Sequence, residues 1–373
     1  MPVAAFASDS DAKLFETKAP NALLIEAQTG TVLYSKNPDS MIAPAALAKL
    51  MTMEVVFDAI KSGTIKLDQE FMVSENAWRT GGAPSRGSTM FAALGSRLTL
   101  GELIQGAIVQ SANDACIIIA EGMAGSEEKF AELMNSRARK IGLSKSVFKN
   151  STGLPADGQV VNLRELTLLA RHIWRTYPDM YQTYSQPDFT WNKIFQRNRN
   201  PLLRLDIGAD GLGTGYTEAS GYAIIGSAER DGRRLFAALG GMTSEAERAQ
   251  EASKLIAFGM DGFEETHLFD VGAIVGSAQV YGGDVAELPL KTLVPVEIFV
   301  PVADRSSVKV KLVYNGPLRA PISAEARIGN LQVWIENNLS QSFPLAAAKD
   351  LPLGSLRSRA TDAALELAFG WLR

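Results

Sequence analysis

The chain has 373 residues, of which 46% are hydrophobic and 21% are charged, and its formal net charge is −4. This balance is typical of a folded soluble protein and excludes a collagen, a coiled coil and a disordered chain. At about 100 to 200 residues per domain, the length favours two domains. The 37 basic and 41 acidic residues nearly cancel, so no nucleic-acid partner is expected.

The first residues resemble the end of an export signal. Residues 1–12 begin with an apolar, alanine-rich stretch that ends in an A-x-A pattern at 5–7 and continues into polar residues. That pattern is typical of a signal-peptide cleavage site, and the alternative is a tag. No run of 18 or more apolar residues is present, so no membrane-spanning helix is expected.

The first half of the chain predicts a strand pair followed by helices. Residues 21–27 and 31–35 are expected to form two strands around a turn at Gly30. The dense apolar stretch at 45–60 predicts a buried helix. Further helices are predicted at 99–124, with a break near 110–113, at 126–141 and at 163–176.

The cysteine and histidine content leaves little material for a metal site. Cys116 is the single cysteine, and its apolar neighbours predict a buried, unreactive thiol. His172 and His267 are the two histidines, and no cysteine cluster accompanies them. Neither a zinc site nor a Ser-His-Asp triad is therefore expected, and we expect no metal and no cofactor.

The second half changes from mixed structure to strands. Residues 223–226 and 235–239 are predicted strands, and a helix is expected at 246–258. From 263 onward, alternating β-branched runs without intervening helices predict a separate all-β domain.

The last residues predict a short amphipathic helix. Within 357–373, Leu367, Trp371 and Leu372 can share one helical face. This segment is too short to span a membrane but can lie at a membrane surface. The alternative is docking on the all-β domain.

Three short segments carry the candidate catalytic and binding residues. They are Ala46-x-x-Lys49 at the start of the buried helix, Ser111-x-Asn113 at the helix break, and the stretch 213–215. Lysine-assisted serine acylation needs a serine at a helix start and a lysine one turn later, so that hydroxyl and amine lie side by side. The corresponding S-x-x-K pattern is weak by itself, and we attribute its literal matches to chance, since they lie in the polar N-terminal tail, at the N-cap of a charged helix, near a turn and in an alternating strand. These matches begin at Ser10, Ser126, Ser146 and Ser306.

In order and separation, the three segments resemble the motifs of the serine-type D-alanyl-D-alanine carboxypeptidases, the low-molecular-mass penicillin-binding proteins. Residues 81–91 and 150–154 agree with the same family, so the resemblance covers nearly the whole chain. It implies an α+β fold, with a penicillin-recognising (β-lactamase/transpeptidase-like) domain of helices on an antiparallel sheet at 13–262. A C-terminal all-β domain at 263–356 and an amphipathic anchor at 357–373 would follow.

The family reaction removes the terminal D-Ala from peptidoglycan stem peptides through a serine acyl-enzyme, and β-lactams acylate the same serine in an active parent. Carried over residue by residue, Lys49 corresponds to the general base. Ser111 and Asn113 correspond to the proton-relay and substrate-holding pair, and Thr214 and Gly215 to the substrate-binding strand. The resemblance also implies an exported, periplasmic protein attached to the outer face of the inner membrane through its C-terminal helix.

Two positions depart from the family pattern. Ala46 stands where the family has its nucleophilic serine, and Gly213 stands where the third motif has its lysine. Alanine cannot be acylated, so we expect the chain to be catalytically inactive. Ser40 and Ser111 are the nearest alternative nucleophiles. The alternatives are a natural pseudoenzyme that binds peptidoglycan or a partner protein, an engineered inactive variant, a hydrolase with another nucleophile, and a structural scaffold with a vestigial cleft.

Overall fold

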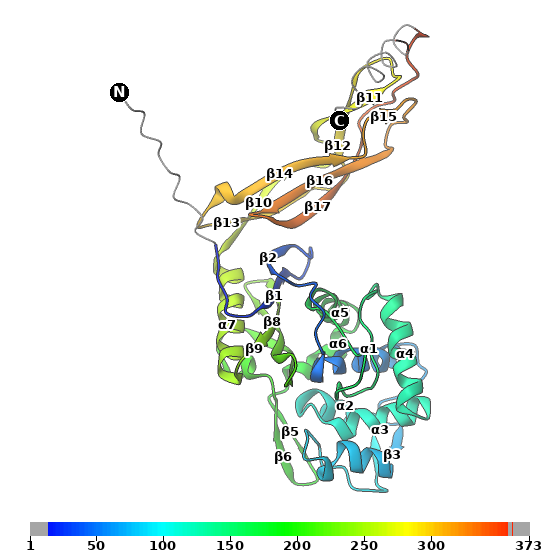
Figure 1. Cartoon of the computed structure of the whole chain (residues 1–373), viewed down its shortest axis with the longest axis vertical. Coiled ribbons are helices and arrows are strands. Elements are labelled where there is room, and N and C mark those ends of the chain that lie inside the picture. The colour runs from blue at the N-terminus through cyan, green and yellow to red at the C-terminus, as the bar shows by residue number, and fades with distance from the viewer. Residues whose placement is uncertain (1–13, 357–359, 361–373) are drawn as a thin grey trace, which may run out of the picture. The chain divides into compact units, whose positions relative to one another are not determined.

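The computed structural model describes residues 14–356 and 360. The chain forms two compact units, which we name the α+β unit and the β unit and describe separately (Figure 1). The α+β unit comprises Phe15–Gly30 and Tyr34–Asp261, and the β unit comprises Leu14, Thr31–Leu33 and the described residues from Gly262 onward.

A five-stranded sheet forms the centre of the α+β unit. In sheet order its strands are β2 (Val32–Lys36), β1 (Asn21–Glu26), β9 (Arg233–Met242), β8 (Gly221–Arg230) and β7 (Ala209–Thr217). The pairs β1–β9, β9–β8 and β8–β7 are antiparallel, and β7 is an edge strand. Asp231 and Gly232 join β8 to β9 with φ angles of 52° and 79°, as a tight two-residue hairpin requires.

Helices in the α+β unit begin at residues suited to helix capping. Thr99 and Glu102 form a capping box, and Ser126 and Asn162 each accept a hydrogen bond from a first-turn N–H. The helices are α1 (Lys49–Lys61), α2 (Leu100–Val109), α3 (Asn113–Ala124), α4 (Glu127–Lys140), α5 (Leu163–Thr176), α6 (Pro178–Tyr181) and α7 (Glu245–Asp261). Two small hairpins accompany them, β3 (Glu70–Met72) with β4 (Arg97–Thr99), and β5 (Asp188–Trp191) with β6 (Ile194–Arg197).

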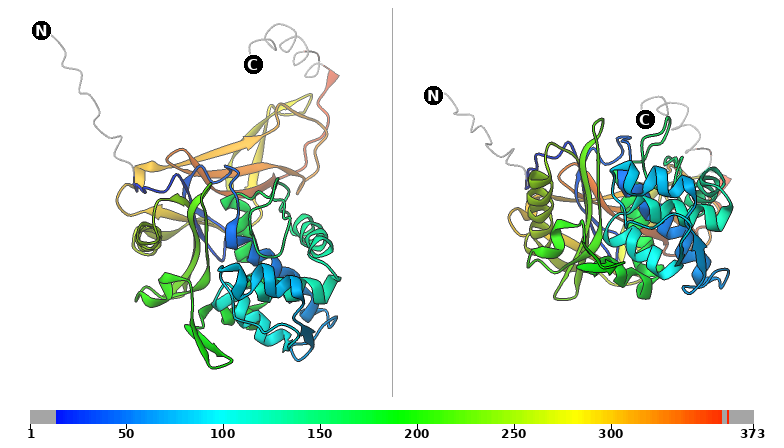
Figure 2. Two further views of the ribbon diagram at one scale, coloured as in Figure 1. Left: turned by 60° about the horizontal axis from the view of Figure 1, so that its bottom comes forward. Right: turned by 90° about the horizontal axis from the view of Figure 1, so that it is seen from below.

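Helices cover both faces of the central sheet. A Cβ at Gly259 of α7 would lie 2.7 Å from the Leu235 side chain, so α7 packs on the face that carries Leu235. Trp174 of α5 contacts Phe236, with ring centroids 6.1 Å apart. Leu235 and Phe236 are consecutive in β9 and point to opposite faces. The two helices therefore pack on opposite faces, and Figure 2 shows α7 apart from the helices of the first half.

The expected helices are confirmed, with one local difference. The stretch predicted at 45–60 begins as a 3₁₀ turn (Ala45–Ala48) and becomes α-helical at Lys49. The predicted break near 110–113 separates α2 from α3. Cys116 in α3 is fully buried, and burial raises the pKa of its thiol to about 12, which agrees with an unreactive thiol.

The β unit consists of a six-stranded sheet and a separate strand pair. In order, the sheet contains β14 (Val308–Tyr314), β16 (Arg327–Ile335), β17 (Asn338–Ala347), β12 (Glu287–Thr292), β11 (Ile274–Tyr281) and β15 (Leu318–Arg319). The pair is β10 (Phe263–Phe269) with β13 (Val296–Pro301), and Ile298, Val333 and Leu345 are buried in the core of the unit. The α+β class with a C-terminal all-β domain is thus confirmed. The segments predicted as signal remnant (1–12) and anchor (357–373) lie outside the described residues, apart from residue 360.

Candidate active site

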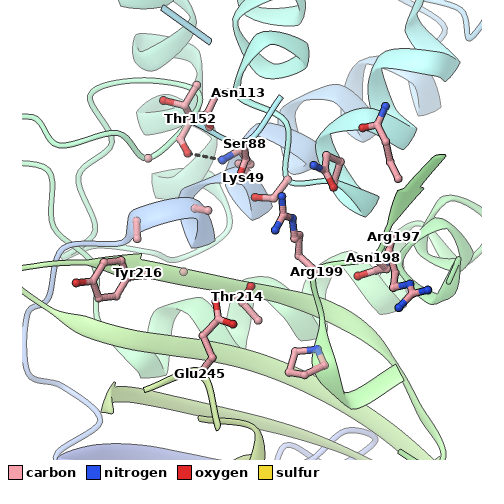
Figure 3. A pocket seen from close by; sticks show the side chains of 18 of the residues that line it. Lys49, Ser88, Asn113, Thr152, Arg197, Asn198, Arg199, Thr214, Tyr216 and Glu245 are labelled. Atoms are coloured by element: carbon pink, nitrogen blue, oxygen red, sulfur yellow. Dashed lines mark hydrogen bonds between the residues drawn. The ribbon is translucent and has the colours of Figure 1, made fainter. Parts of the chain in front are cut away.

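An open cleft of about 920 Å³ lies in the α+β unit and collects the three sequence motifs (Figure 3). Its walls come from the turn before α1, the loop between α2 and α3, strand β7, and the β5–β6 hairpin with the segment that follows it. Ser40, one of the alternative nucleophiles, is not among the residues that line it. The predicted site residues that line the cleft are Ala46, Lys49, Ser111, Asn113, Thr214 and Gly215.

Ala46 lies in the 3₁₀ turn ahead of α1. The preceding Ala45 has a φ of 49°, a left-handed conformation that residues with side chains rarely adopt. A Cβ at Gly153 would lie 1.7 Å from the Ala45 carbonyl oxygen, so only glycine allows this close approach. The turn is therefore held against the 150–154 loop. Position 46 itself offers a backbone N–H and a methyl group, but no hydroxyl.

Lys49 is the first residue of α1, three positions after Ala46 and thus nearly one turn further along. Its side chain is buried, and Nζ donates a hydrogen bond to the Thr152 carbonyl oxygen at 2.9 Å (dashed line in Figure 3). Burial lowers the pKa of Lys49, and the smaller opposing effects of Cys116 and Asp114 do not cancel it. The neutral amine is therefore more accessible than in an exposed lysine, which suits a proton acceptor.

Ser111 and Asn113 are presented by the loop between α2 and α3. Ser111 has a φ of 58°, and the Asn113 N–H donates to the Ser88 carbonyl oxygen at 2.7 Å. The buried Asp114 carboxylate accepts hydrogen bonds from the Thr89 hydroxyl at 2.6 Å and from two backbone N–H groups of the 90–92 segment. These bonds tie the start of α3 to the loop that carries Ser88 into the cleft.

Strand β7 forms the opposite wall. Thr214 and Gly215 pair with β8 on one side, and their other edge pairs with no strand of the sheet. A Cβ at Gly215 would lie 3.0 Å from that of Ala45, so β7 packs closely against the 3₁₀ turn. Among the described residues, a Cβ at Gly213 would have no neighbour within 4 Å. Gly213 lines a smaller adjoining cavity rather than the main cleft.

The cleft also contains residues outside the three motifs. Figure 3 shows Arg199 reaching into the space between Lys49 and Thr214, and within the described chain its side chain has no hydrogen-bond or ion-pair partner. Arg248 is 6% exposed, and its guanidinium lies 5.5 Å from the centroid of the Tyr222 ring. Other polar residues that line the cleft include Ser88, Thr152 and Asn198.

Sequence gave no clear signal for the two arginines, because an arginine in a loop or helix usually reads as a solvated surface residue. Ser88 and Thr152 had a signal, since they lie in the 81–91 and 150–154 stretches that carry part of the resemblance. Together, the cationic side chains and the free edge of β7 suit an extended peptide with a negatively charged end.

Comparison with known proteins agrees with this geometry. The D-alanyl-D-alanine carboxypeptidase family matches residues 6–243, and the C-terminal domain of penicillin-binding protein 5 matches residues 263–352. The chain is 35% identical to D-alanyl-D-alanine carboxypeptidase DacD of Escherichia coli over 350 residues, which are 93% of this chain and 90% of that protein.

Solved structures agree with the sequence relatives. The carboxypeptidase DacD of Francisella tularensis superposes with a TM-score of 0.76 at 28% identity, covering 91% of this chain and 95% of the other. Penicillin-binding protein D2 of Listeria monocytogenes, solved in an ampicillin-bound form, gives 0.58 at 28% identity over 66% of this chain and 99% of the other. The chain therefore belongs to the serine-type D-alanyl-D-alanine carboxypeptidases, the low-molecular-mass penicillin-binding proteins.

Proposed function

We propose that this chain is a non-catalytic member of its family that binds, without hydrolysing, peptidoglycan stem peptides ending in D-Ala-D-Ala. The observation that carries the proposal is the alanine at position 46, in a cleft that otherwise retains Lys49, Ser111, Asn113 and Thr214. Without a hydroxyl at position 46, no acyl-enzyme forms there. Loss of the nucleophile in another serine hydrolase lowers turnover about 10⁶-fold.

Three of the retained residues have a binding role in this proposal. The amide of Asn113 and the hydroxyls of Ser111 and Thr214 hydrogen-bond the peptide, which lies along the free edge of β7. We further propose that backbone N–H groups at Ala46 and on strand β7 near Thr214 donate to the carbonyl oxygen that an active enzyme would attack.

The charge at the peptide terminus depends on other side chains, because Gly213 removes the cation of the third motif. Four arginines line the cleft, and of these we propose Arg199 and Arg248 as guanidinium partners for a terminal carboxylate; the others are Arg197 and Arg204. We expect weak, reversible binding, with a dissociation constant of roughly 1 mM, or about −4 kcal/mol. Titration calorimetry with a pentapeptide ending in D-Ala-D-Ala, against the same peptide ending in L-Ala, tests this. Equal heats for the two peptides would leave the scaffold with a vestigial cleft as the better explanation.

The proposed lack of acylation has a separate test. Intact-protein mass spectrometry after incubation with penicillin should show no mass gain for this chain. The double variant Ala46→Ser/Gly213→Lys should gain one ring-opened drug per molecule, because it regains both the nucleophile and the cation. Each single variant should label more slowly, since both groups act on one transition state. Labelling of the unmodified chain would instead direct attention to Ser111.

Because the proposed ligand is peptidoglycan, we also propose that the protein is exported and held at the outer face of the inner membrane. Within residues 14–356 and 360, no helix is long and apolar enough to cross a membrane. The proposed attachment therefore rests on the sequence pattern of 357–373. Removal of these residues should abolish flotation with anionic vesicles and leave the thermal midpoint unchanged. A large fall in the midpoint would favour docking on the β unit.

A further inference from the structure

A small cavity beside Gly213 has no role in the proposed function. It adjoins the cleft, measures about 30 Å³, and is lined by parts of α1, α2, β7 and the 198–200 segment. A side chain at position 213 would extend into open space, since no atom of the residues that the structure describes lies within 4 Å of its Cβ. About 10 to 15 Å³ is enough for one water molecule, so the cavity has room for a water or an ion of similar size.

Two buried polar side chains line this cavity without a partner. Tyr184 is 3% exposed and Asn200 is 1% exposed. Among the described residues, the Tyr184 hydroxyl and the Asn200 Nδ2 have no hydrogen-bond partner. The orientation of the Asn200 amide is set, because its Oδ1 accepts the Leu202 N–H at 3.0 Å. Buried polar groups are nearly always hydrogen-bonded, so two unpaired groups that line one cavity indicate a ligand-binding site there.

The charged side chains around the cavity indicate whether that ligand is an anion or a cation. Lys49 and Arg199 line it, and no aspartate or glutamate is found among its described lining residues. Burial raises the pKa of Tyr184 well above its usual value, so its hydroxyl is a donor at neutral pH. The Nδ2 of Asn200 can only donate. Two donors and the Arg199 guanidinium, with no carboxylate among the described lining residues, favour negative charge.

We propose that the cavity beside Gly213 binds a monatomic anion, chloride in the simplest case. The Tyr184 hydroxyl and the Asn200 amide donate hydrogen bonds to it, and the Arg199 guanidinium supplies the compensating charge. This site depends on glycine at position 213, because a longer side chain would enter the same space. The inference concerns the chain as it stands and does not depend on peptide binding.

Bromide is the probe, since it can replace chloride and scatters anomalously. Crystals of the full chain soaked in sodium bromide should give an anomalous peak in the cavity, within hydrogen-bonding distance of both Tyr184 Oη and Asn200 Nδ2. In solution, bromide should raise the thermal midpoint above that in gluconate at equal ionic strength, with a saturable dependence on concentration. Density for water alone in the cavity, without an anomalous peak, overturns the proposal.

Variants separate this site from general salt effects. Tyr184→Phe removes one donor and keeps the ring, and it should weaken bromide binding about tenfold or more. Tyr181→Phe is the matched control, because Tyr181 does not line the cavity and its hydroxyl bonds to Asp210; its bromide response should be unchanged.

A third variant, Gly213→Met, should abolish binding by filling the cavity with a flexible apolar side chain. It keeps the proposal testable even if Tyr184→Phe does not fold. Unaltered bromide binding in either Tyr184→Phe or Gly213→Met contradicts the assignment.

Discussion

Two glycines in the loop beside the cleft share a left-handed backbone but differ in their surroundings. Gly153 has a φ of 80°, and its Cβ would collide with the Ala45 carbonyl oxygen at 1.7 Å. Gly158 has a φ of 75°, and its nearest neighbour would be Cε of Lys149 at 3.7 Å. The two positions therefore separate the cost of backbone conformation from the cost of the collision.

Alanine at these positions should have different effects. Gly158→Ala should lower the free energy of unfolding by about 1 to 2 kcal/mol, the cost of a left-handed residue with a Cβ. Gly153→Ala should cost clearly more, because the 3₁₀ turn that carries Ala46 must also move. Denaturant unfolding of both variants measures the difference. Equal losses would show that the Ala45–Gly153 contact does not hold the turn.

Some residues of the cleft can be predicted from the sequence, and others cannot. Lys49, Ser111 and Thr214 belong to short segments whose order and separation resemble those of a known family, so the sequence of a single chain indicates them. Arg199 and Arg248 enter the cleft through the packing of distant segments, and no local pattern marks them. The same limit applies to the cavity beside Gly213, which only the fold encloses.

At the scale of elements, the helices were predictable because caps and apolar spacing are local signals. The 3₁₀ start of the first helix was not, since its cause is contact with the 150–154 loop and β7. Another non-local contact joins α7 to the N-terminal segment of the α+β unit. Glu251 of α7 is buried and accepts hydrogen bonds from the Thr17 hydroxyl at 2.7 Å and the Lys18 N–H at 3.0 Å.

This contact should make stability depend on pH. Burial alone would raise the pKa of Glu251, but the hydrogen bonds from Thr17 and Lys18 and the charge of Lys254 outweigh it, so the pKa lies below its usual value. A lowered carboxyl pKa contributes stability above the pKa of the unfolded chain, about 4.3. The contribution is lost as pH falls through the folded-state value.

Glu251→Gln should lower the free energy of unfolding by about 1 to 3 kcal/mol at pH 7. The gap to the parent chain should close as the pH falls below about 4. Urea unfolding across this pH range measures it. Glu132→Gln, at an exposed position of α4, is the control and should have little effect. A gap that stays constant down to low pH would mean that the Glu251 charge is not what ties the segment to α7.

At the scale of the molecule, the α+β unit and the β unit each contain a hydrophobic core of their own. Ile118 of α3 is fully buried in the first, and Leu345 of β17 is fully buried in the second. Chains built from separate cores often depart from two-state unfolding. Sequence predicted this division because the change from mixed structure to alternating strands near residue 263 is itself a local signal.

The two cores should therefore melt in separable transitions. Truncation of a buried leucine or isoleucine to alanine costs about 2 to 5 kcal/mol. Ile118→Ala should lower the midpoint of one transition by several degrees, and Leu345→Ala should lower the midpoint of the other. Scanning calorimetry resolves the two transitions. Penicillin labelling in the Ala46→Ser/Gly213→Lys background then shows which transition belongs to the α+β unit, because the cleft lies in that unit. The Leu345→Ala chain should retain labelling at temperatures where its own transition is complete. A single transition that shifts equally in both variants would instead show that the two cores unfold as one.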